Sequence, residues 1–314
     1  MAKPFRIALA FALAAASPAG NALETGSLDV GGLRRTYVVA LPEQLKPGAL
    51  VPLVILLHGA GGRGLVALQN YRWDTKAAVE GFIAVAPDAA PAFIGLAADF
   101  RTNPRYWNDG SDRGPAQHRQ VDDTAFIARL IDQLVGRYPI DAQRVYATGF
   151  SSGASMVHRI GIELADRLAA IAPVAGKAWL EIEPKRPVSV LFLVGDKDPL
   201  TPVDGGLVKL PWGGQQSFPP ARDLPQKWAR LDHCGKPVVA SPQAGLTLQA
   251  WRSCADDSEV LFYIVAGLGH EWAGGTGRLL PEAMTGPYTD SVDTTALIWR
   301  FFERHRLTRG SKAP

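Results

Sequence analysis

The stretch RVYATGFSSGASM, Arg144–Met156, decides the fold. Its first part, Arg144–Thr148, predicts a strand, and the residues that follow the motif predict a helix to about Leu168. Between the two lies GFSSG, which matches the pattern G-x-S-x-G at a strand-to-helix turn. Such a turn holds its central serine in a strained conformation and needs small neighbours where backbone packs on backbone. Ser151 is therefore the candidate nucleophile.

The rest of the chain continues this alternation of strands and helices. We expect strands at 36–41, 51–57, 81–87, 169–174, 188–194 and 259–265, and further helices at 121–138 and 291–305. This order implies an α/β fold with a mostly parallel central sheet and helices on both faces. Ligands then bind at the carboxyl ends of the strands. Two irregular stretches, 88–120 and 197–222, are too long for ordinary connections and indicate lids or binding walls.

A serine nucleophile needs a base, and the chain has six histidines. His270 lies in GLGHEW, on a loop directly after the last predicted strand, and its place after Ser151 in the chain suits the base of a serine nucleophile. Four other histidines are better explained as surface or packing residues: His118, His158, His233 and His305. We therefore expect His270 to accept the Ser151 proton.

His58 stands in LHGAGG, Leu57–Gly62, a glycine-rich turn after a predicted strand. Such a turn exposes backbone N–H groups, so we expect the N–H of Ala60 to form half of an oxyanion hole. The N–H of Ser152, directly after the nucleophile, is the expected second donor. The alternative for Leu57–Gly62 is a simple tight turn.

The acid that orients the base should lie between serine and histidine in the chain. GDKDP, Gly195–Pro199, follows a predicted strand and carries two aspartates, Asp196 and Asp198. Either could accept the histidine Nδ1–H. Asp196 could instead cap the turn through its own backbone. Position alone leaves the two residues equal.

The N-terminus has the pattern of a signal peptide. Lys3 and Arg6 precede ten uncharged apolar residues, Ile7–Ala16, and small residues suit a cleavage site after Ala22. The alternative is an uncleaved anchor, but the apolar run falls short of the roughly 20 residues that span a bilayer. We expect residues 1–22 to be removed and the protein to be periplasmic or extracellular.

Composition and charge indicate an ordinary globular protein. The chain has 314 residues, 47% of them hydrophobic and 20% charged, and no linker divides it, so we expect one catalytic domain over residues 23–314. Without Lys3 and Arg6, 31 basic and 30 acidic side chains remain, a net charge of +1. This near neutrality does not favour nucleic acid or an anionic membrane as a partner. A monomer without a cofactor is expected.

Cys234 and Cys254 are the two cysteines of the chain. In an oxidising compartment a pair twenty residues apart is a plausible disulfide, worth about 3 kcal/mol in the chain-entropy picture. The alternatives are two buried thiols or a metal site. His233 stands alone beside them, which is poor zinc spacing, so no metal is expected.

Several of these stretches strongly resemble the polyhydroxybutyrate-depolymerase-like esterases, a group that merges into the family-1 carbohydrate esterases with feruloyl and acetylxylan esterases. The similar segments are PLVILLHGAGG, YWN, the run from VDDTAF to SSGASM, LAAIAPVAG, VGDKDPLTP and GLGHEW. The resemblance covers about residues 30–305 and implies a serine esterase of the α/β-hydrolase fold. It implies Ser151 as nucleophile, His270 as base and Asp198, the aspartate before Pro-x-x-Pro, as acid. Cysteines near 234 and 254 are often bridged in that group.

The resemblance favours acetyl or feruloyl esters on plant polysaccharide as substrates, with a 3-hydroxybutyrate oligomer or amorphous polyester as the alternative. Trp107, Asn108 and Trp272 are the expected substrate-binding residues, and Trp179 and Trp212 also lie in loops. Two other functions are alternatives. A peptidase on this fold would usually carry a further propeller or cap domain. A non-catalytic binding protein would be expected to have lost the serine, the histidine or the aspartate, and candidates for all three are present.

Overall fold

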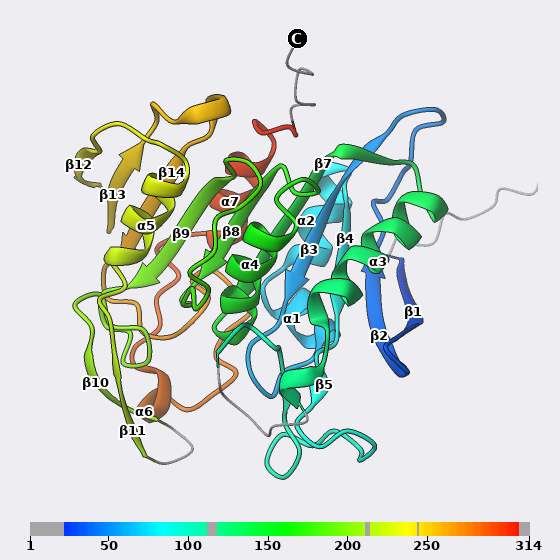
Figure 1. Ribbon diagram of the computed structural model, residues 1–314, viewed down its shortest axis with the longest axis horizontal. Helices are drawn as coiled ribbons and strands as arrows, with labels where there is room; N and C mark the ends of the chain where they lie inside the picture. The colour runs from blue at the N-terminus through cyan, green and yellow to red at the C-terminus, as the bar shows by residue number, and fades with distance from the viewer. Residues whose placement is uncertain (1–21, 112–117, 211–213, 244, 308–314) are drawn as a thin grey trace, which may run out of the picture.

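A computed structural model describes residues 22–111, 118–210, 214–243 and 245–307. The expected signal peptide lies outside the described residues except for Ala22, and so does Trp212. Within the described residues, ten strands form one sheet in the order β1-β2-β4-β3-β7-β8-β9-β14-β13-β12 (Figure 1). The six strands from β4 to β14 in that order are mutually parallel. At each edge of the sheet, two further strands pair antiparallel with their neighbours. The sheet confirms the expected α/β fold.

The strands of this sheet are β1 (Leu23–Val30), β2 (Leu33–Ala40), β3 (Val51–Leu57), β4 (Ile83–Pro87), β7 (Ile140–Phe150), β8 (Ala170–Val174), β9 (Ser189–Gly195), β12 (Val238–Gln243), β13 (Leu246–Trp251) and β14 (Val260–Val265). The helices are α1 (Gly64–Asn70), α2 (Trp73–Glu80), α3 (Asp123–Arg137), α4 (Ser152–Glu163), α5 (Asp223–Leu231), α6 (Glu282–Thr285) and α7 (Thr294–Phe302), with 3-10 turns at His118–Gln120 and Ala255–Asp257.

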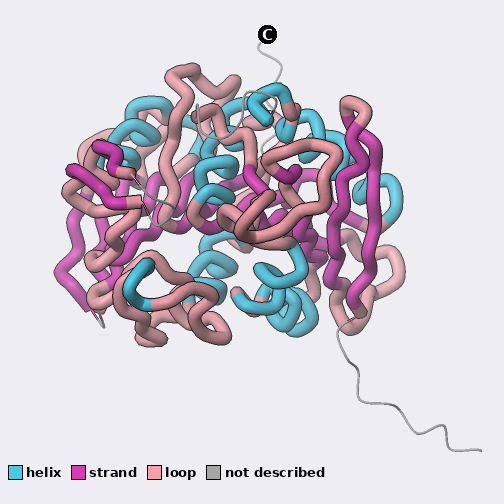
Figure 2. The backbone as a smooth tube through the Cα atoms, turned by 90° about the horizontal axis from the view of Figure 1, so that it is seen from below, coloured by secondary structure: helices cyan, strands magenta, loops and turns pink. Residues whose placement is uncertain are grey.

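Helices cover both faces of the sheet, and Figure 2 shows the strands as a band between them. One buried cluster joins the sheet to α3, α4 and α5, and a second joins the opposite face to α1, α2 and α7. Strand β3 shows why: Leu53 and Ile55 belong to the first cluster, whereas Val54 and Leu56 belong to the second. Because successive side chains of a strand point to opposite faces, a strand buried on both faces must be apolar throughout.

Local sequence explains where helix α3 begins. The Asp122 carboxylate accepts the N–H of Ala125 at 2.8 Å and caps its first turn. Helix α4 follows β7 with Ser151 between them, as expected, but ends at Glu163 rather than near Leu168. Strand β7 runs from Ile140, four residues before the expected start.

The two long irregular stretches contain short hairpins. Strands β5 (Ala90–Pro91) and β6 (Arg105–Tyr106) pair within the first, and β10 (Gly206–Lys209) and β11 (Gln215–Phe218) pair within the second. In Figure 1 these hairpins and α6 lie at the lower edge of the molecule, at the carboxyl ends of the parallel strands.

A disulfide joins Cys234, three residues after α5, to Cys254, three residues after β13, as the sequence predicted. The bridge ties the antiparallel edge of the sheet to the helix that covers it. Across the described ranges, no helix combines the length and the apolar character needed to span a bilayer.

Candidate active site

Ser151 occupies a strained turn at the carboxyl end of β7. Its backbone has φ 56° and ψ −118°, a region that a residue with a side chain rarely adopts, and its N–H donates to Val174 O of the neighbouring β8 at 3.0 Å. The turn aims the side chain out of the sheet, at the N-terminal end of α4. Unpaired N–H groups at a helix N-terminus favour negative charge.

The two glycines of GFSSG are required by close approach of the backbone. A Cβ on Gly153 would lie 2.1 Å from Leu57 O and 2.5 Å from His58 O. A Cβ on Gly149 would lie 2.8 Å from Leu57 O. The nucleophile turn therefore packs directly against the end of β3 and the turn that follows it.

Three side chains from separate loops meet at this turn. The His270 Nε2 lies 2.8 Å from Ser151 Oγ, and its Nδ1 lies 2.8 Å from Asp198 Oδ2. The other carboxylate oxygen of Asp198 accepts the N–H groups of Leu200 and Thr201 at 2.8 and 2.7 Å. With both oxygens engaged and the side chain fully buried, the carboxylate holds one orientation toward the imidazole.

Asp196, the rival acid, points elsewhere. Its Oδ1 accepts the N–H of Gly267 at 2.7 Å, and its side chain is 36% exposed. It therefore ties the end of β9 to the loop that follows β14. Of the two aspartates, the geometry brings only Asp198 to His270.

The glycine-rich turn Leu57–Gly62, which we call the oxyanion turn, lies beside the nucleophile. A Cβ added at Gly59 would lie 3.4 Å from Ser151 Cβ, and the N–H of Gly62 closes the turn on Gly59 O at 3.0 Å. Within the described part of the chain, the N–H groups of Ala60 and Ser152 have no hydrogen-bond acceptor. Both donors are thus available at the mouth of the nucleophile turn.

His58 braces this turn rather than reacting. Its Nδ1–H donates to Gly59 O at 2.7 Å, and its Nε2 accepts the N–H of Ala89 at 3.0 Å. Burial lowers the pKa of His58 to about 4, since it penalises the charged ring. The ring is therefore neutral near pH 7, with a fixed tautomer that supports the turn from inside.

The residues expected to contact substrate have engaged polar groups. Trp107 is 4% exposed and donates from Nε1 to His58 O at 2.8 Å. The side chain of Asn108 donates to Val121 O at 2.8 Å. Trp272 is 3% exposed, stacks on Tyr71 with ring centroids 4.4 Å apart, and donates to Thr295 Oγ1 at 3.1 Å. Both indoles lie below the surface and hold the loops of the site.

Two hydrogen bonds hold the loop that carries His270 against the segment at α6. No motif in the sequence indicated a role for this segment. The N–H of His270 donates to Thr285 O, and the hydroxyl of Thr285 donates to Glu271 Oε1 at 2.7 Å. Burial raises the pKa of Glu271. A Cβ on Gly269 would lie 2.1 Å from Thr285 O, so this loop also needs its glycine.

Three of the remaining histidines, His118, His158 and His305, have structural surroundings, whereas His233 is exposed. His158 is fully buried, its Nδ1 accepts the Trp228 Nε1–H at 3.0 Å, and burial lowers its pKa to about 3. His305 lies 3.4 Å from Glu259 Oε1, and His118 is buried. Among the described residues, no cluster of histidine, cysteine, aspartate and glutamate could hold a metal ion.

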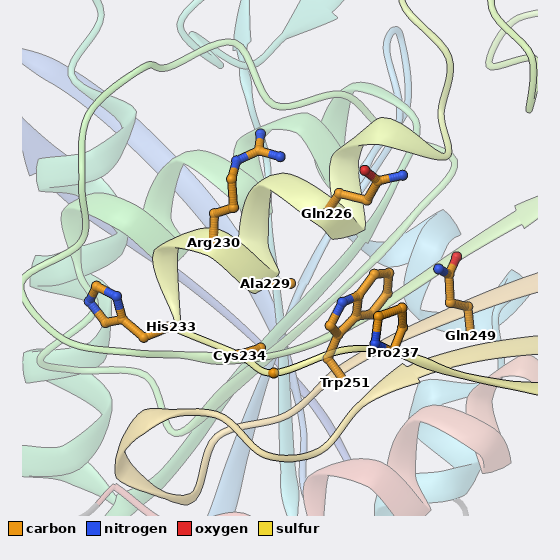
Figure 3. A pocket seen from close by; sticks show the side chains of 9 residues that line it. Gln226, Ala229, Arg230, His233, Cys234, Pro237, Gln249 and Trp251 are labelled. Carbon is orange, nitrogen blue, oxygen red and sulfur yellow. The ribbon is translucent and has the colours of Figure 1, made fainter.

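A pocket of about 580 Å³ lies beside the disulfide, between α5 and β13 (Figure 3). Its lining includes Gln226, Arg230, His233 and Trp251. None of the three side chains of the Ser151 site takes part in it, so the pocket is separate from the candidate active site.

The chain is similar to known esterases in sequence and in fold. The phospholipase/carboxylesterase family profile matches residues 46–206, about half of the chain, including Ser151 and Asp198. Feruloyl esterase B of Piromyces equi is 28% identical over 78% of this chain and 44% of its own length. NocK of Nocardia uniformis subsp. tsuyamanensis, named as an esterase, is 30% identical over 74% of this chain and 69% of its own length. The chain thus spans less than half of the Piromyces protein.

Among solved structures, the acetyl xylan esterase of Aspergillus awamori superposes with a TM-score of 0.60. The match covers 90% of this chain and 99% of that one at 14% identity, which shows a shared fold. The family match over half of the chain shows that the chain belongs to the phospholipase/carboxylesterase family of α/β hydrolases.

Proposed function

We propose that this protein is a serine esterase that hydrolyses carboxylic esters through an acyl-enzyme on Ser151. One observation carries the proposal: the His270 ring lies 2.8 Å from both Ser151 Oγ and Asp198 Oδ2. A serine hydroxyl, a neutral imidazole and a buried carboxylate in this order form the relay that activates a serine for attack on a carbonyl. The family to which the chain belongs supports the same chemistry.

Acylation begins when His270 Nε2 takes the Ser151 proton as Oγ bonds to the ester carbonyl carbon. Negative charge then develops on the carbonyl oxygen, where the N–H groups of Ala60 and Ser152 donate to it. The imidazolium, held by Asp198, returns its proton to the leaving alcohol as the carbon–oxygen bond breaks. The acyl group stays on Ser151 Oγ.

Deacylation repeats these steps with water as the nucleophile. His270 takes a proton from water as the water oxygen bonds to the acyl carbon, and it gives that proton to Ser151 Oγ as the acyl bond breaks. A carboxylic acid leaves, and the hydroxyl of Ser151 is restored. No cofactor enters this cycle.

For the substrate, we propose acetyl or feruloyl esters on plant polysaccharide. Relatives named as feruloyl esterase and as acetylxylan esterase support this class. In this proposal Trp107, Asn108 and Trp272 shape the site by holding its loops. A panel with xylan acetate, methyl ferulate and a 3-hydroxybutyrate trimer tests the choice, and preference for the trimer would contradict it.

We further infer that the chain is exported after removal of residues 1–22 and acts as a monomer on its ester substrate. The leader pattern and the Cys234–Cys254 bridge support export, since disulfides persist in oxidising compartments.

Replacement of Ser151 tests the nucleophile directly. We expect Ser151→Ala to fold normally and to lower kcat/KM for 4-nitrophenyl acetate by roughly 10⁴-fold or more, because the relay acts as one unit. The same change should abolish labelling by a fluorophosphonate. Ser253→Ala, at an exposed serine beside the disulfide, is the matched control and should keep full activity. An active, labelled Ser151→Ala protein would contradict the assignment.

A further inference from the structure

Residues 92–103, which we call the Phe100 loop, project between β5 and β6 at the carboxyl edge of the sheet (Figure 1). The base of the loop is closed, because β5 pairs with β6 and the N–H of Ala92 donates to Pro104 O at 2.8 Å. A single buried amide fixes the first half of the loop. The Asn103 Nδ2 donates to the carbonyl oxygens of Phe93, Leu96 and Ala97, and its Oδ1 accepts the N–H of Phe93 at 2.8 Å.

The second half of the loop is fixed by Asp99. Its Oδ1 accepts the backbone N–H groups of Arg101 and Thr102 and the hydroxyl of Thr102. These bonds lower the pKa of the Asp99 carboxyl, so the carboxylate stays charged and engaged. The Asp99 and Asn103 side chains are therefore used to shape the loop itself.

The ordered loop holds large apolar side chains in solvent. Phe93 is 45% exposed, Leu96 is 65% exposed and Phe100 is 56% exposed. Exposed apolar side chains gathered on one segment mark a binding surface more often than scattered ones do. Here the hydrogen bonds of Asn103 and Asp99 fix the backbone from which these side chains project.

Phe100 lies directly against the oxyanion turn. A Cβ on Gly61 would lie 2.7 Å from two carbon atoms of the Phe100 ring, and Gly61 has φ +73°, so the backbone and the ring are in contact. The N–H of Gly61 donates to Arg105 O at 2.8 Å, which joins the turn to the base of the Phe100 loop. Gly61 is the neighbour of Ala60, a proposed oxyanion donor. The exposed ring therefore borders the position of the ester carbonyl.

We propose that Phe100 binds the aromatic ring of an arylpropenoyl acyl group, such as a feruloyl group, while the carbonyl of that group occupies the oxyanion hole. The proposal rests on the proposed esterase function and names its acyl substrate. An aromatic ring gains from stacking on another, beyond the area that it buries. A sugar would also need hydrogen-bonding side chains beside the ring, whereas Asp99 and Asn103 are occupied within the loop. An acetyl group is too small to reach an aromatic ring and gains little from it.

The test compares two esters with the same leaving group, 4-nitrophenyl ferulate and 4-nitrophenyl acetate. We expect Phe100→Ala to lower the ratio of kcat/KM for ferulate over acetate about tenfold, the loss of one ring contact. Phe100→Tyr keeps the ring and should keep the ratio within about twofold. Val79→Ala, at a 74% exposed apolar position on α2, is the matched control and should leave the ratio unchanged.

The outcomes separate the two claims. Wild-type protein inactive on both esters would refute the esterase function, and the role of Phe100 with it. Wild-type protein active on acetate but not on ferulate would refute only the aromatic acyl group. An unchanged ratio in Phe100→Ala, or an equal loss on both esters, would show that the ring only supports the oxyanion turn. Fluorophosphonate labelling of each variant shows that its Ser151 site is folded.

Discussion

Two aspartates that stand two residues apart have different surroundings. Asp198 is buried and accepts hydrogen bonds from His270 and from two backbone N–H groups, whereas Asp196 is partly exposed and holds Gly267. A carboxylate that orients an imidazole and stabilises its charged form contributes strongly to the rate. A carboxylate that accepts one backbone N–H contributes mainly to stability, by about 1 kcal/mol.

Replacing each aspartate by asparagine therefore separates the catalytic role of Asp198 from the structural role of Asp196. We expect Asp198→Asn to lower kcat for 4-nitrophenyl acetate by about 10³ to 10⁴-fold, because the amide favours the wrong histidine tautomer. Asp196→Asn should stay within a few-fold of the wild-type rate and lose about 1 kcal/mol of unfolding free energy. Steady-state kinetics and urea titration measure both effects. The reverse pattern of rates would show that Asp196 orients the base.

At the scale of elements, the nucleophile turn exists only because β7, α4 and the end of β3 touch through backbone. Gly153 lies where α4 begins and faces the carbonyl oxygens of Leu57 and His58. The oxyanion turn follows β3, so the same contact fixes the distance between Ser151 and its proposed N–H donors. A side chain at Gly153 would push the helix away from both.

Gly153→Ala tests this contact. An added Cβ 2.1 Å from Leu57 O forces α4 and β3 apart, so we expect a loss of about 1–3 kcal/mol in unfolding free energy and a large loss of kcat. Gly136→Ala is the matched control, because an added Cβ on that exposed position of α3 meets nothing within 4 Å. It should stabilise the protein by about 0.5–1 kcal/mol. Urea unfolding of both variants checks the opposite signs.

At the scale of the whole molecule, a buried carboxyl lies where α5, β9 and the disulfide-linked edge meet. Asp232 follows α5, its Oδ1 accepts the N–H of Val188 at 3.1 Å, and its carbonyl accepts the N–H of Ala255. Burial raises the pKa of Asp232 from 3.8 to about 7, although Val188, Ser258 and Arg186 oppose the shift. Between pH 3.8 and about pH 7, the folded protein thus keeps a proton on Asp232 that the unfolded chain has released.

This shift predicts how stability depends on pH. The raised pKa of the folded state favours folding below pH 4, and that contribution is lost as pH rises toward 7. Asp232→Asn keeps a neutral group at the same place. Its advantage over the wild type in unfolding free energy should therefore grow by about 2–3 kcal/mol when the pH is raised from 5 to 8. Asp223→Asn, at an exposed position of the same helix, should show no such gain. Equal differences at both pH values would mean that Asp232 is ionised in the folded protein.

The sequence predicted best those elements whose side chains are buried along their whole length. Val51–Leu57 is aliphatic throughout because it is buried on both faces, and its bounds match β3. Strand β1 is half exposed and lacks a clear apolar alternation, so sequence did not indicate it. The sequence also left Asp196 and Asp198 equal without the resemblance, because only packing decides which of two neighbours reaches His270. Trp107 and Trp272 show the same limit, since a loop position does not reveal burial.

The order of the strands has one further consequence. Ser151 and His270 are 119 residues apart in the chain, and they meet only when β14 has paired with β9 beside β8 and β7. A nascent or half-assembled chain therefore carries an inert serine. Regained turnover during refolding would report completion of the sheet, because no fragment that ends before β14 contains both partners of the proton transfer.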